Sequence, residues 1–575
     1  MLSKLSATLR IAIFSLIASA AIFLILSSAW QESAVINENI NINSGRQCLT
    51  TLNCEGIANT SPLTGILSSL PLLIKNADTQ SPELNLNLAR IIPIILAFIL
   101  ILLTYVFSKE LIGRWWALLP VFFLAFSPTL LSKGHYVIAD IGTTLGIFIA
   151  LTAFLKFLLN KNTRNLILAG LSLGLAQLFN FSAVFLIPYC ILLMIIFYFT
   201  RVMEDWPLTN STERRKRFIA KAFRYCRHLI FIFIIAAILI YLFTLLFTWQ
   251  SPYPEKTFLG LNPHLLLKPI EYYFNGISVY LQSLNSPTYI FENIYDSAPW
   301  YYLPAVFTLK EPLPLVLAVI AALLIGFWKF IKNLASTLFK RSGKTLEYFS
   351  THFPEFAMIL LIIAYAAVGN KKILPILPFI LILTSESIKN WFNLENLNKA
   401  RNFIIKLTIL ANELAGISVK TILLILALTL YLSSALIAYP HFTSYFNMAA
   451  GGSMKGYRYL VDENYDLGQG LNQLSQWIKS NLPPEEKIAV DYYGSGDLQY
   501  YLGNRAEPWL SAEGTPTTDN INWLAISATN LQMAKAKIIG AYLRKPEDEY
   551  QWLENPHEPY AHAGTIFIYK LNPSR

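Results

Sequence analysis

Charged side chains are scarce in this chain of 575 residues. Only 14% of the residues are Asp, Glu, Lys or Arg, whereas 54% are hydrophobic. A soluble globular protein carries about 25% charged residues. Length alone would suggest several soluble domains, but this composition excludes that interpretation. The chain is therefore expected to be a polytopic membrane protein.

Cysteine is also rare, with four residues in the whole chain. No CxxC pair and no Cys/His cluster is present, so the sequence predicts no metal site and no cofactor. Cys190 and Cys226 are expected to be inert. Cys48 and Cys54 lie six positions apart in the first polar loop. If that loop is exported they can form a disulfide, and two free thiols are the equal alternative.

Long apolar runs dominate the first three quarters of the chain. A helix needs about 20 apolar residues to cross the hydrocarbon core of a membrane. The first run resembles a signal peptide, but it continues to Ala29 and is predicted to be a retained span. About eleven spans are expected, at residues 7–29, 90–107, 115–131, 140–159, 164–179, 181–200, 229–249, 302–328, 354–369, 373–386 and 419–438.

The net charge of +10 is unevenly distributed. Residues 440–575 hold 15 acidic and 11 basic side chains, a net of −4, which leaves +14 for the rest. The basic clusters all fall on the side of the N-terminus, at 109–114, 156–164, 214–227, 329–344 and 389–406. Cytoplasmic loops are enriched in Lys and Arg, so this pattern indicates topology and not a nucleic-acid surface. Loops 30–89 and 250–301 and the tail are expected outside.

The tail from Pro440 has the pattern of a small α/β domain. Residues 487–494 and 565–571 alternate or run apolar like strands. Residues 470–482 place apolar side chains at helical spacing, and 531–544 is expected to be a second helix. The predicted organisation is a membrane region, residues 1–439, followed by an exported α/β domain, residues 440–575.

Several polar side chains stand at the expected outer ends of the spans. Glu32 follows the first span, His135 and Asp140 lie between the third and fourth, and Lys310 and Lys371 lie near later spans. The lysines break the sidedness rule. A single such lysine is explained by snorkelling, in which the stem lies in lipid and the ammonium in water. Several cations on one face, with carboxylates among them, favour a site for the phosphate of a lipid-linked substrate.

A carboxylate and phosphate-binding cations suit the transfer of a sugar from a polyprenyl-phosphate donor. The carboxylate would take the proton of an acceptor hydroxyl as the oxygen attacks the anomeric carbon. The cations would stabilise the departing lipid phosphate, so that no metal is required.

Six segments, in order, resemble the bacterial phospholipid carrier-dependent glycosyltransferases, which are related to protein O-mannosyltransferases. The segments are "GHYVIADIGTTLGIFIALTAFLKFL", "GLSLGLAQLFNFSAVFLIP", "WYYLPAVFTLKEPLPLVL", "NKKILPILPF", "YFNMAAGGSMKGYRYLVDENYDLGQGL" and "NWLAISATNL". The resemblance implies a GT-C type membrane fold in the bacterial cytoplasmic (inner) membrane. It also implies a polyprenyl-phosphate-linked sugar donor, an acceptor protein, lipid or glycan, and catalysis on the exported side.

The resemblance also implies the site residues. Glu32 and Asp140 are the candidate catalytic carboxylates, and the candidate substrate-binding residues are His135, Lys310, Lys371 and Gln31. Gln31 occupies the position of the family's catalytic Asp, and a glutamine cannot act as a base. Either Glu32 serves in its place, or Asp140 or Glu38 does, or activity is lost.

Two other functions remain open from the sequence. The first is a catalytically degenerate relative that binds polyprenyl-phosphate sugars during envelope assembly without transferring them. The second is a transporter, which broken helices and outer charges would also suit, although the chain shows no matched inverted halves.

Overall fold

The computed structural model describes residues 2–54, 62–74, 82–204, 211–252, 266–340, 351–392, 403–516, 521–553 and 558–571. Most of these residues are helical. The helices of the membrane region are α1 (Leu2–Ala29), α5 (Ile91–Leu111), α6 (Leu118–Ala125), α7 (Pro128–Lys133), α8 (Ala139–Leu159), α9 (Thr163–Phe179), α10 (Leu186–Glu204), α11 (Ser211–Phe247), α13 (Tyr302–Lys310), α14 (Leu313–Lys340), α16 (Phe353–Ala367), α17 (Leu377–Trp391) and α18 (Phe403–Ala438).

Seven helices in the described part of the chain are long and apolar enough to cross a membrane. They coincide with seven of the predicted spans. The other four predicted spans fall on shorter helices: α9, α16, α17, and the pair α6 and α7, which a break before Pro128 separates. The structure therefore confirms a polytopic helical membrane protein. Segments 341–350 and 393–402, which carry parts of two basic clusters, lie outside the described residues.

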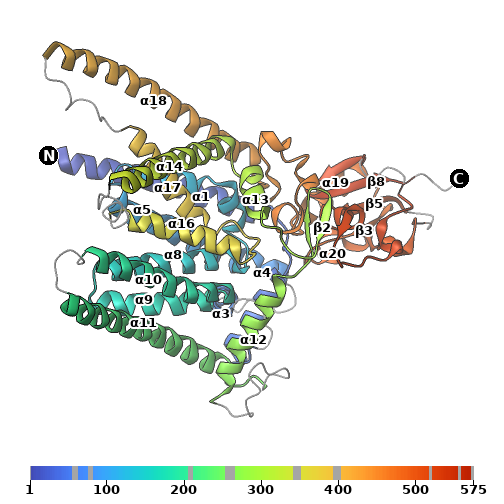
Figure 1. The fold of residues 1–575 in the computed structure, drawn as a ribbon. Coiled ribbons are helices and arrows are strands. Elements are labelled where there is room, and N and C mark those ends of the chain that lie inside the picture. The colour runs from blue at the N-terminus through green and yellow to red at the C-terminus, as the bar shows by residue number, and fades with distance from the viewer. Residues whose placement is uncertain are drawn as a thin grey trace.

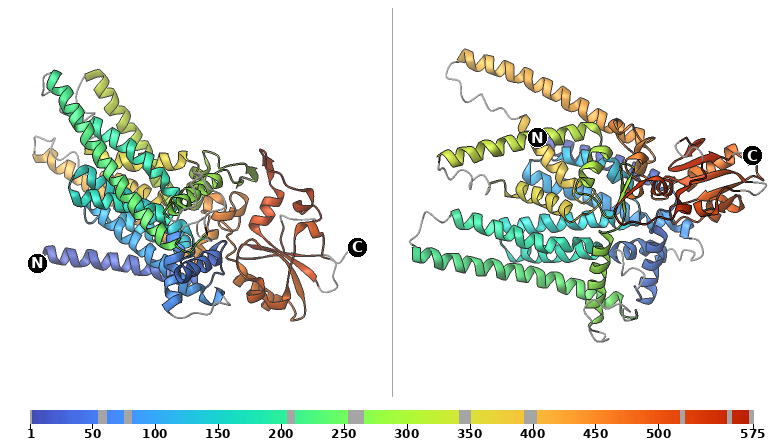
Figure 2. Two further views of the ribbon diagram at one scale, coloured as in Figure 1. Left: turned by 90° about the horizontal axis from the view of Figure 1, so that it is seen from below. Right: turned by 45° about the vertical axis from the view of Figure 1, so that its right-hand side comes forward.

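The long helices run side by side, and the C-terminal domain lies beyond one end of them (Figures 1 and 2). The N-terminus lies at the opposite end of this helical bundle (Figure 1). The N-terminus and the tail thus lie at opposite ends of the bundle, and their placement on opposite sides of a membrane stays a prediction. The end of the bundle that carries the tail is called the outer end below.

Four further helices gather at the outer end: α2 (Glu38–Thr51), α3 (Pro62–Ile74), α4 (Pro82–Ala89) and α12 (Lys268–Ser283). Helix α12 runs across the direction of the bundle (Figure 1). Cys48, in the last turn of α2, forms a disulfide with Cys54, just beyond the helix, which decides between the two possibilities left open by the sequence. The Cys54 backbone N–H donates to Ser251 Oγ at 3.0 Å, so the disulfide loop is fastened beyond the end of α11.

The C-terminal domain contains a five-stranded sheet with the order β4-β3-β5-β8-β7. Its strands are β3 (Lys487–Asp491), β4 (Ala506–Pro508), β5 (Ile521–Ser527), β7 (Ala561–Ala563) and β8 (Ile566–Lys570). The helices of this domain are α19 (Leu471–Asn481), α20 (Leu498–Leu502) and α21 (Ala528–Lys535). Leu471, Leu474 and Ile478 on one face of α19 share a core with strand side chains, as the helical spacing predicted.

A second sheet joins the tail to the loop before α13. Strands β1 (Thr288–Ile290) and β2 (Asn293–Tyr295) form a hairpin, and β6 (Lys537–Ile539) pairs parallel to β2. The predicted helix 531–544 is therefore wrong in its second half, because α21 ends at Lys535. Ile538 and Ile539 are β-branched, and pairing with a strand more than 240 residues earlier overrides the helical pattern.

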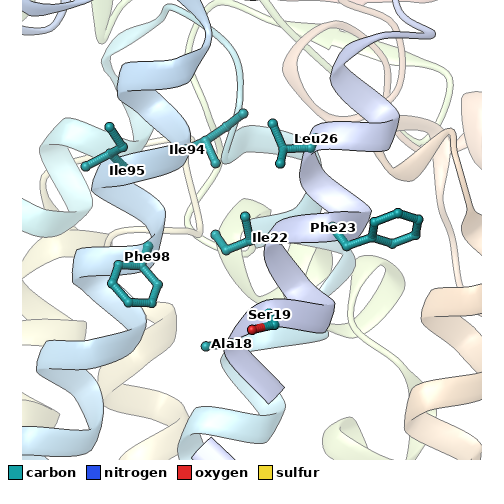
Figure 3. A pocket seen from close by; sticks show the side chains of 8 residues that line it. All are labelled: Ala18, Ser19, Ile22, Phe23, Leu26, Ile94, Ile95 and Phe98. Atoms are coloured by element: carbon teal, nitrogen blue, oxygen red, sulfur yellow. The ribbon is translucent and has the colours of Figure 1, made fainter. Parts of the chain in front are cut away.

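An apolar groove of about 470 Å³ lies between α1 and α5. Its lining side chains come from these two helices; in Figure 3, Ile22, Leu26 and Ile94 lie between them, whereas Phe23 points away. Ser19 contributes the one hydroxyl in the lining. Such a surface is expected where helices face lipid.

Candidate functional site

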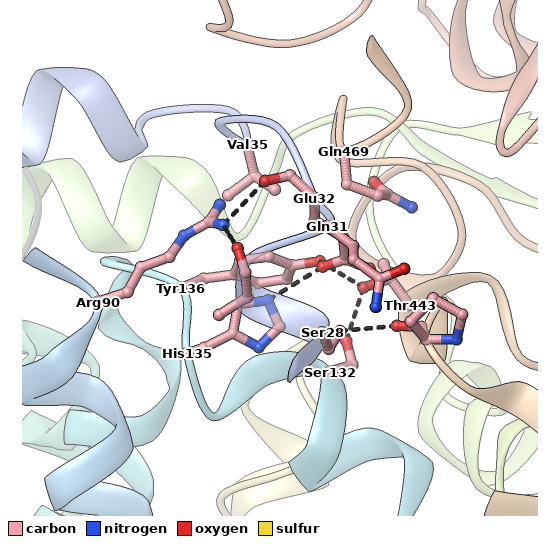
Figure 4. A network of polar contacts seen from close by, with 12 residues as sticks. Ser28, Gln31, Glu32, Val35, Arg90, Ser132, His135, Tyr136, Thr443 and Gln469 are labelled. Atoms are coloured by element: carbon pink, nitrogen blue, oxygen red, sulfur yellow. Dashed lines mark hydrogen bonds and ion pairs between the residues drawn. The ribbon is translucent and has the colours of Figure 1, made fainter. Parts of the chain in front are cut away.

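Glu32 lies just beyond α1 and is buried at the outer end of the bundle (Figure 4). Its Oε2 atom accepts a hydrogen bond of 2.6 Å from the Tyr136 hydroxyl and lies 3.0 Å from His135 Nε2. Glu32 Oε1 and His135 Nδ1 have no hydrogen-bond partner among the described residues. The structure thus brings Glu32 and His135 together, and it leaves one carboxylate oxygen able to accept a proton.

Gln31 faces away from this network. Its side chain is exposed, and Nε2 donates to the Tyr439 hydroxyl at 3.1 Å and to the Ser27 carbonyl at 3.2 Å. Gln31 and Glu32 are neighbours in sequence but have different environments. The loss of a carboxylate at position 31 therefore leaves the Glu32 network intact.

A buried ion pair fixes the backbone around Glu32. Arg90, just before α5, donates all five of its N–H groups: two to the Glu38 carboxylate and three to the carbonyls of Ala29, Glu32 and Ser33. Glu38 also accepts the backbone N–H groups of Val35 and Val137, each at 3.0 Å. Both side chains are fully buried.

Glu38 is consequently a structural carboxylate. Burial by itself would raise its pKa, but the charge and hydrogen bonds of Arg90 and the two backbone N–H groups lower the pKa below its usual value. Each oxygen of the Glu38 carboxylate accepts two hydrogen bonds, one from Arg90 and one from a backbone N–H, so all of its lone pairs are used. Glu38 therefore has no free oxygen with which to act as a base.

The segment after α18 covers Glu32. Thr443 Oγ1 lies 2.7 Å from the Tyr136 hydroxyl and 2.9 Å from Ser132 Oγ. Ser28 Oγ donates to the Pro440 carbonyl at 2.7 Å. These contacts bring side chains from α1, the 132–136 segment and the start of the tail into one network (Figure 4). Only about 1% of the Glu32 side chain is exposed in this arrangement.

Asp140 belongs to a second cluster. It lies in the first turn of α8, where Oδ1 pairs with Lys372 Nζ and Oδ2 lies 3.7 Å from Lys133 Nζ. Glu463 contributes a second carboxylate, with Oε1 3.7 Å from Lys372 Nζ, and its carbonyl accepts from Lys133 Nζ at 2.8 Å. About a third of the Lys372 and Glu463 side chains is exposed, so this lysine–carboxylate cluster reaches the surface.

The cluster alters the proton affinities of its members. Burial lowers the pKa of Lys133 and raises the pKa of Glu463. Burial also opposes the charge of Lys372, but Asp140 and Glu463 outweigh it and raise the pKa of Lys372 above its usual value. Lys372 is therefore firmly cationic, as a phosphate-binding group must be.

The two predicted lysines are held elsewhere. Lys310 is buried, and its ammonium donates to the carbonyls of Thr443 and Asn464 at 2.7 and 2.6 Å. Lys371 donates to the carbonyl and hydroxyl of Ser286 at 3.0 and 2.7 Å. Lys310 fastens the tail to α13. The ion pairs of Asp140 and Glu32 are made by Lys133, Lys372 and His135 instead. Both ammonium groups are bound to carbonyl or hydroxyl oxygens of the protein, and their role in holding phosphate stays a prediction.

The tail also binds the loop that carries Glu32. The backbone N–H of Ile36 donates to the Leu467 carbonyl at 2.8 Å, and Ser33 Oγ donates to the Gly468 carbonyl at 3.0 Å. Gly468 has φ +92°, and a Cβ there would lie 2.5 Å from the Tyr493 carbonyl oxygen. A glycine is thus required at position 468, where the chain packs against the backbone of Tyr493 and Gly494 within the same domain.

Several residues of the site were missed by sequence reasoning: Arg90, Lys133, Tyr136, Thr443 and, as a member of the cluster, Glu463. Arg90 could have been found by the criterion that selected Lys310, because it is a cation at the outer end of a span. Tyr136 and Thr443 carry no charge, so that criterion does not select them, although Tyr136 lies within a segment that carries the family resemblance. The described residues contain no group of three or more His, Cys, Asp or Glu placed to hold a metal ion.

Comparison with known proteins agrees with the predicted resemblance. Residues 84–211 match the family described as dolichyl-phosphate-mannose-protein mannosyltransferase. The match is limited to these residues, about a fifth of the chain, and is a similarity of that part to the family. No curated protein matches the chain in sequence.

Similar solved structures are distant in sequence. The apo oligosaccharyltransferase of Archaeoglobus fulgidus has a TM-score of 0.47 and 14% identity, over 92% of this chain and 71% of that one. ArnT from Cupriavidus metallidurans bound to undecaprenyl phosphate has a TM-score of 0.44 and 12% identity, over 96% and 97%. The Saccharomyces cerevisiae Pmt1-Pmt2 complex bound to the sugar donor has a TM-score of 0.33 and 18% identity, over 41% and 33%.

Proposed function

We propose that this chain, as a relative of lipid-carrier-dependent glycosyltransferases, moves a sugar from a polyprenyl-phosphate donor to an acceptor hydroxyl. The reaction would take place on the exported face of the bacterial cytoplasmic membrane. The observation that carries the proposal is the partly exposed cluster at the outer end, in which Lys133 and Lys372 flank Asp140. The family match over residues 84–211 supports the class of reaction.

The donor phosphate is assigned to the lysine–carboxylate cluster. Lys372 is cationic and one third exposed, so it can exchange a carboxylate contact for a phosphate oxygen. Both Asp140 oxygens face lysines, so Asp140 holds the two ammonium groups in place and is a positioning residue. Such cations contribute to catalysis mainly because they stabilise the negative charge that develops on the leaving phosphate.

The proton of the acceptor is assigned to Glu32. The acceptor oxygen attacks the anomeric carbon, the bond from that carbon to the phosphate oxygen breaks, and the acceptor proton passes to the free Oε1 of Glu32. Tyr136 and His135 hold the other oxygen and fix the orientation of the carboxylate. Thr443 must move from Tyr136 and Ser132 before an acceptor can reach this oxygen, because Glu32 is covered in the present state.

The test uses the full chain reconstituted with a polyprenyl-phosphate sugar and a panel of acceptors. Glu32→Gln is expected to lower transfer by about 100- to 10,000-fold, the usual contribution of a general base. Binding of the donor by this variant should remain unchanged. Asp140→Asn should weaken donor binding, since it removes the counter-charge that positions both lysines. Full activity of Glu32→Gln would remove Glu32 from the mechanism.

A second function is favoured by one observation, the exposed Gln31 beside a fully covered Glu32. In that case the chain binds the lipid-linked sugar in envelope assembly without transferring it. The same experiment separates the two functions. Donor binding by the wild type without turnover, together with gain of transfer in Gln31→Asp, would establish the non-catalytic function.

A further inference from the structure

Glu463 has a different role in the cluster from Asp140. Asp140 is buried and faces both lysines, whereas the Glu463 carboxylate reaches Lys372 at 3.7 Å and keeps 30% of its side-chain surface exposed. The Glu463 side chain is therefore the loosely held anion of the cluster, and it lies on the open side.

The backbone that presents Glu463 is firmly anchored. Asp462, the first residue of the 3-10 turn η8 (Asp462–Asn464), has φ +52°. Its carboxylate accepts from the Tyr493 hydroxyl at 2.6 Å, and its N–H donates to Thr529 Oγ1 at 3.0 Å. Lys133 and Lys310 bind the carbonyls of Glu463 and Asn464. With the main chain fixed from both sides, the side chain of Glu463 can swing while its backbone stays in place.

Among the groups in direct ion-pair contact, the charges balance while Glu463 is in place. Lys133 and Lys372 supply two positive charges, and Asp140 and Glu463 supply two negative ones. Asp462 is a further nearby carboxylate, held by the Tyr493 hydroxyl, and it stays in place when Glu463 moves. Removal of the Glu463 carboxylate leaves one positive charge. A polyprenyl-phosphate sugar is a phosphodiester with one negative charge, so its binding would neutralise the remaining positive charge. The carrier released after transfer is a monoester with about −1.5 to −2 charges.

We propose that Glu463 is a built-in anion that occupies the lysine pair in the unliganded protein and exchanges with the phosphate of the lipid-linked donor. The carboxylate swings away when the diester binds, and it competes with the monoester after transfer, which favours release of the spent carrier. Glu463 cannot at the same time serve as the base, because it contacts the lysines assigned to the leaving phosphate. A base must lie near the opposite face of the anomeric carbon, where the acceptor attacks. This inference rests on the proposed function.

Binding of undecaprenyl phosphate to the full chain in nanodiscs, at fixed ionic strength, tests the proposal. Glu463→Gln is expected to bind about tenfold more tightly than the wild type, because a competing charge near the lysines is lost. Glu463→Asp keeps the charge and should bind like the wild type. Glu513→Gln removes a charge from an exposed residue of the same domain and is the matched control.

Turnover by the same variants gives a second measurement. In the Glu463→Gln variant, added undecaprenyl phosphate should inhibit transfer at about tenfold lower concentration than in the wild type. Unchanged or weaker binding by Glu463→Gln, while the wild type binds, overturns the role of Glu463 and leaves the proposed function standing. If Glu463→Gln abolishes transfer but binds undecaprenyl phosphate like the wild type, the proposed exchange is wrong and Glu463 acts as a base. Absence of carrier binding by the folded wild type overturns the proposed function itself.

Discussion

At the scale of single residues, Asp466 shows how a buried carboxyl group can make stability depend on pH. It lies between η8 and α19, and its oxygens accept from the N–H groups of Gly468 and Thr529 at 3.1 Å and from Thr565 Oγ1 at 2.8 Å. Burial nevertheless dominates and raises its pKa to about 6. The folded chain thus holds this proton more tightly than the unfolded chain.

The expected result is a loss of stability as pH rises. The contribution of Asp466 is complete below its unfolded pKa of about 3.8 and disappears as pH passes through about 6. Thermal unfolding of the purified protein between pH 4 and 7.5 would show this decline, and Asp466→Asn should flatten it. Thr565→Val removes a donor that favours the ionised form, so it should extend the decline to higher pH. A slope that is identical in all three proteins would contradict the assignment.

At the scale of elements, the Cys48–Cys54 disulfide closes the end of α2 against the end of α11. Cys48, Cys54 and Ile66 are buried together, with Phe243 and Phe247 of α11 packed against them. The Gln250 N–H also donates to the Leu52 carbonyl at 3.1 Å. Helix α2 begins at Glu38, so the disulfide fixes the far end of the helix that starts at the Arg90 ion pair.

Removal of the disulfide is expected to lower stability. Replacement of both cysteines by serine should cost about 2–3 kcal/mol in the free energy of unfolding, the value expected for so short a loop. Thermal unfolding without reductant would measure it, and dithiothreitol should reproduce the effect in the wild type. Cys226→Ser, at an exposed free thiol, is the control and should leave the midpoint unchanged. An equal midpoint for the double variant would show that packing alone holds this end of α2.

The elements were largely predictable, and the site only in part. Apolar runs and basic clusters located the membrane helices, because lipid and sidedness constrain the sequence directly. The same rules mark Glu32, His135 and Asp140, but they do not mark Tyr136 beside Glu32 or Lys133 beside Asp140. Tyr136 meets Glu32 only through the packing of α1 on the 132–136 segment. Likewise, β6 was predicted as helix because its partner β2 lies far away in the sequence.

At the scale of the whole molecule, the tail and the first outer loop form one unit. Ser33 Oγ donates to the Gly468 carbonyl and accepts from the Leu471 N–H at 3.1 Å. Tyr492 of the tail donates its hydroxyl to carbonyls of the same two segments. The C-terminal domain therefore helps to shape the Glu32 network and is more than an attached module.

Ser33→Ala is expected to loosen this attachment. The buried Leu471 N–H would lose its acceptor, at a cost of about 1–3 kcal/mol. Limited proteolysis should then cleave the tail faster than in the wild type, and transfer should fall with it. Ser433→Ala in α18, whose hydroxyl bonds a carbonyl of its own helix, serves as the control. Equal cleavage rates for the wild type and Ser33→Ala would show that other contacts suffice to hold the tail.

The contact between Ser33 and Gly468 joins residues 435 positions apart. The ribosome makes the Glu32 loop early and its partner 435 residues later. During synthesis, the first loop therefore lacks these contacts until every helix between the two segments has been made. A truncated or stalled chain would contain all the spans that precede the tail and still lack the backbone contacts that shape the Glu32 loop. Completion of the chain is thus coupled to assembly of the backbone around Glu32.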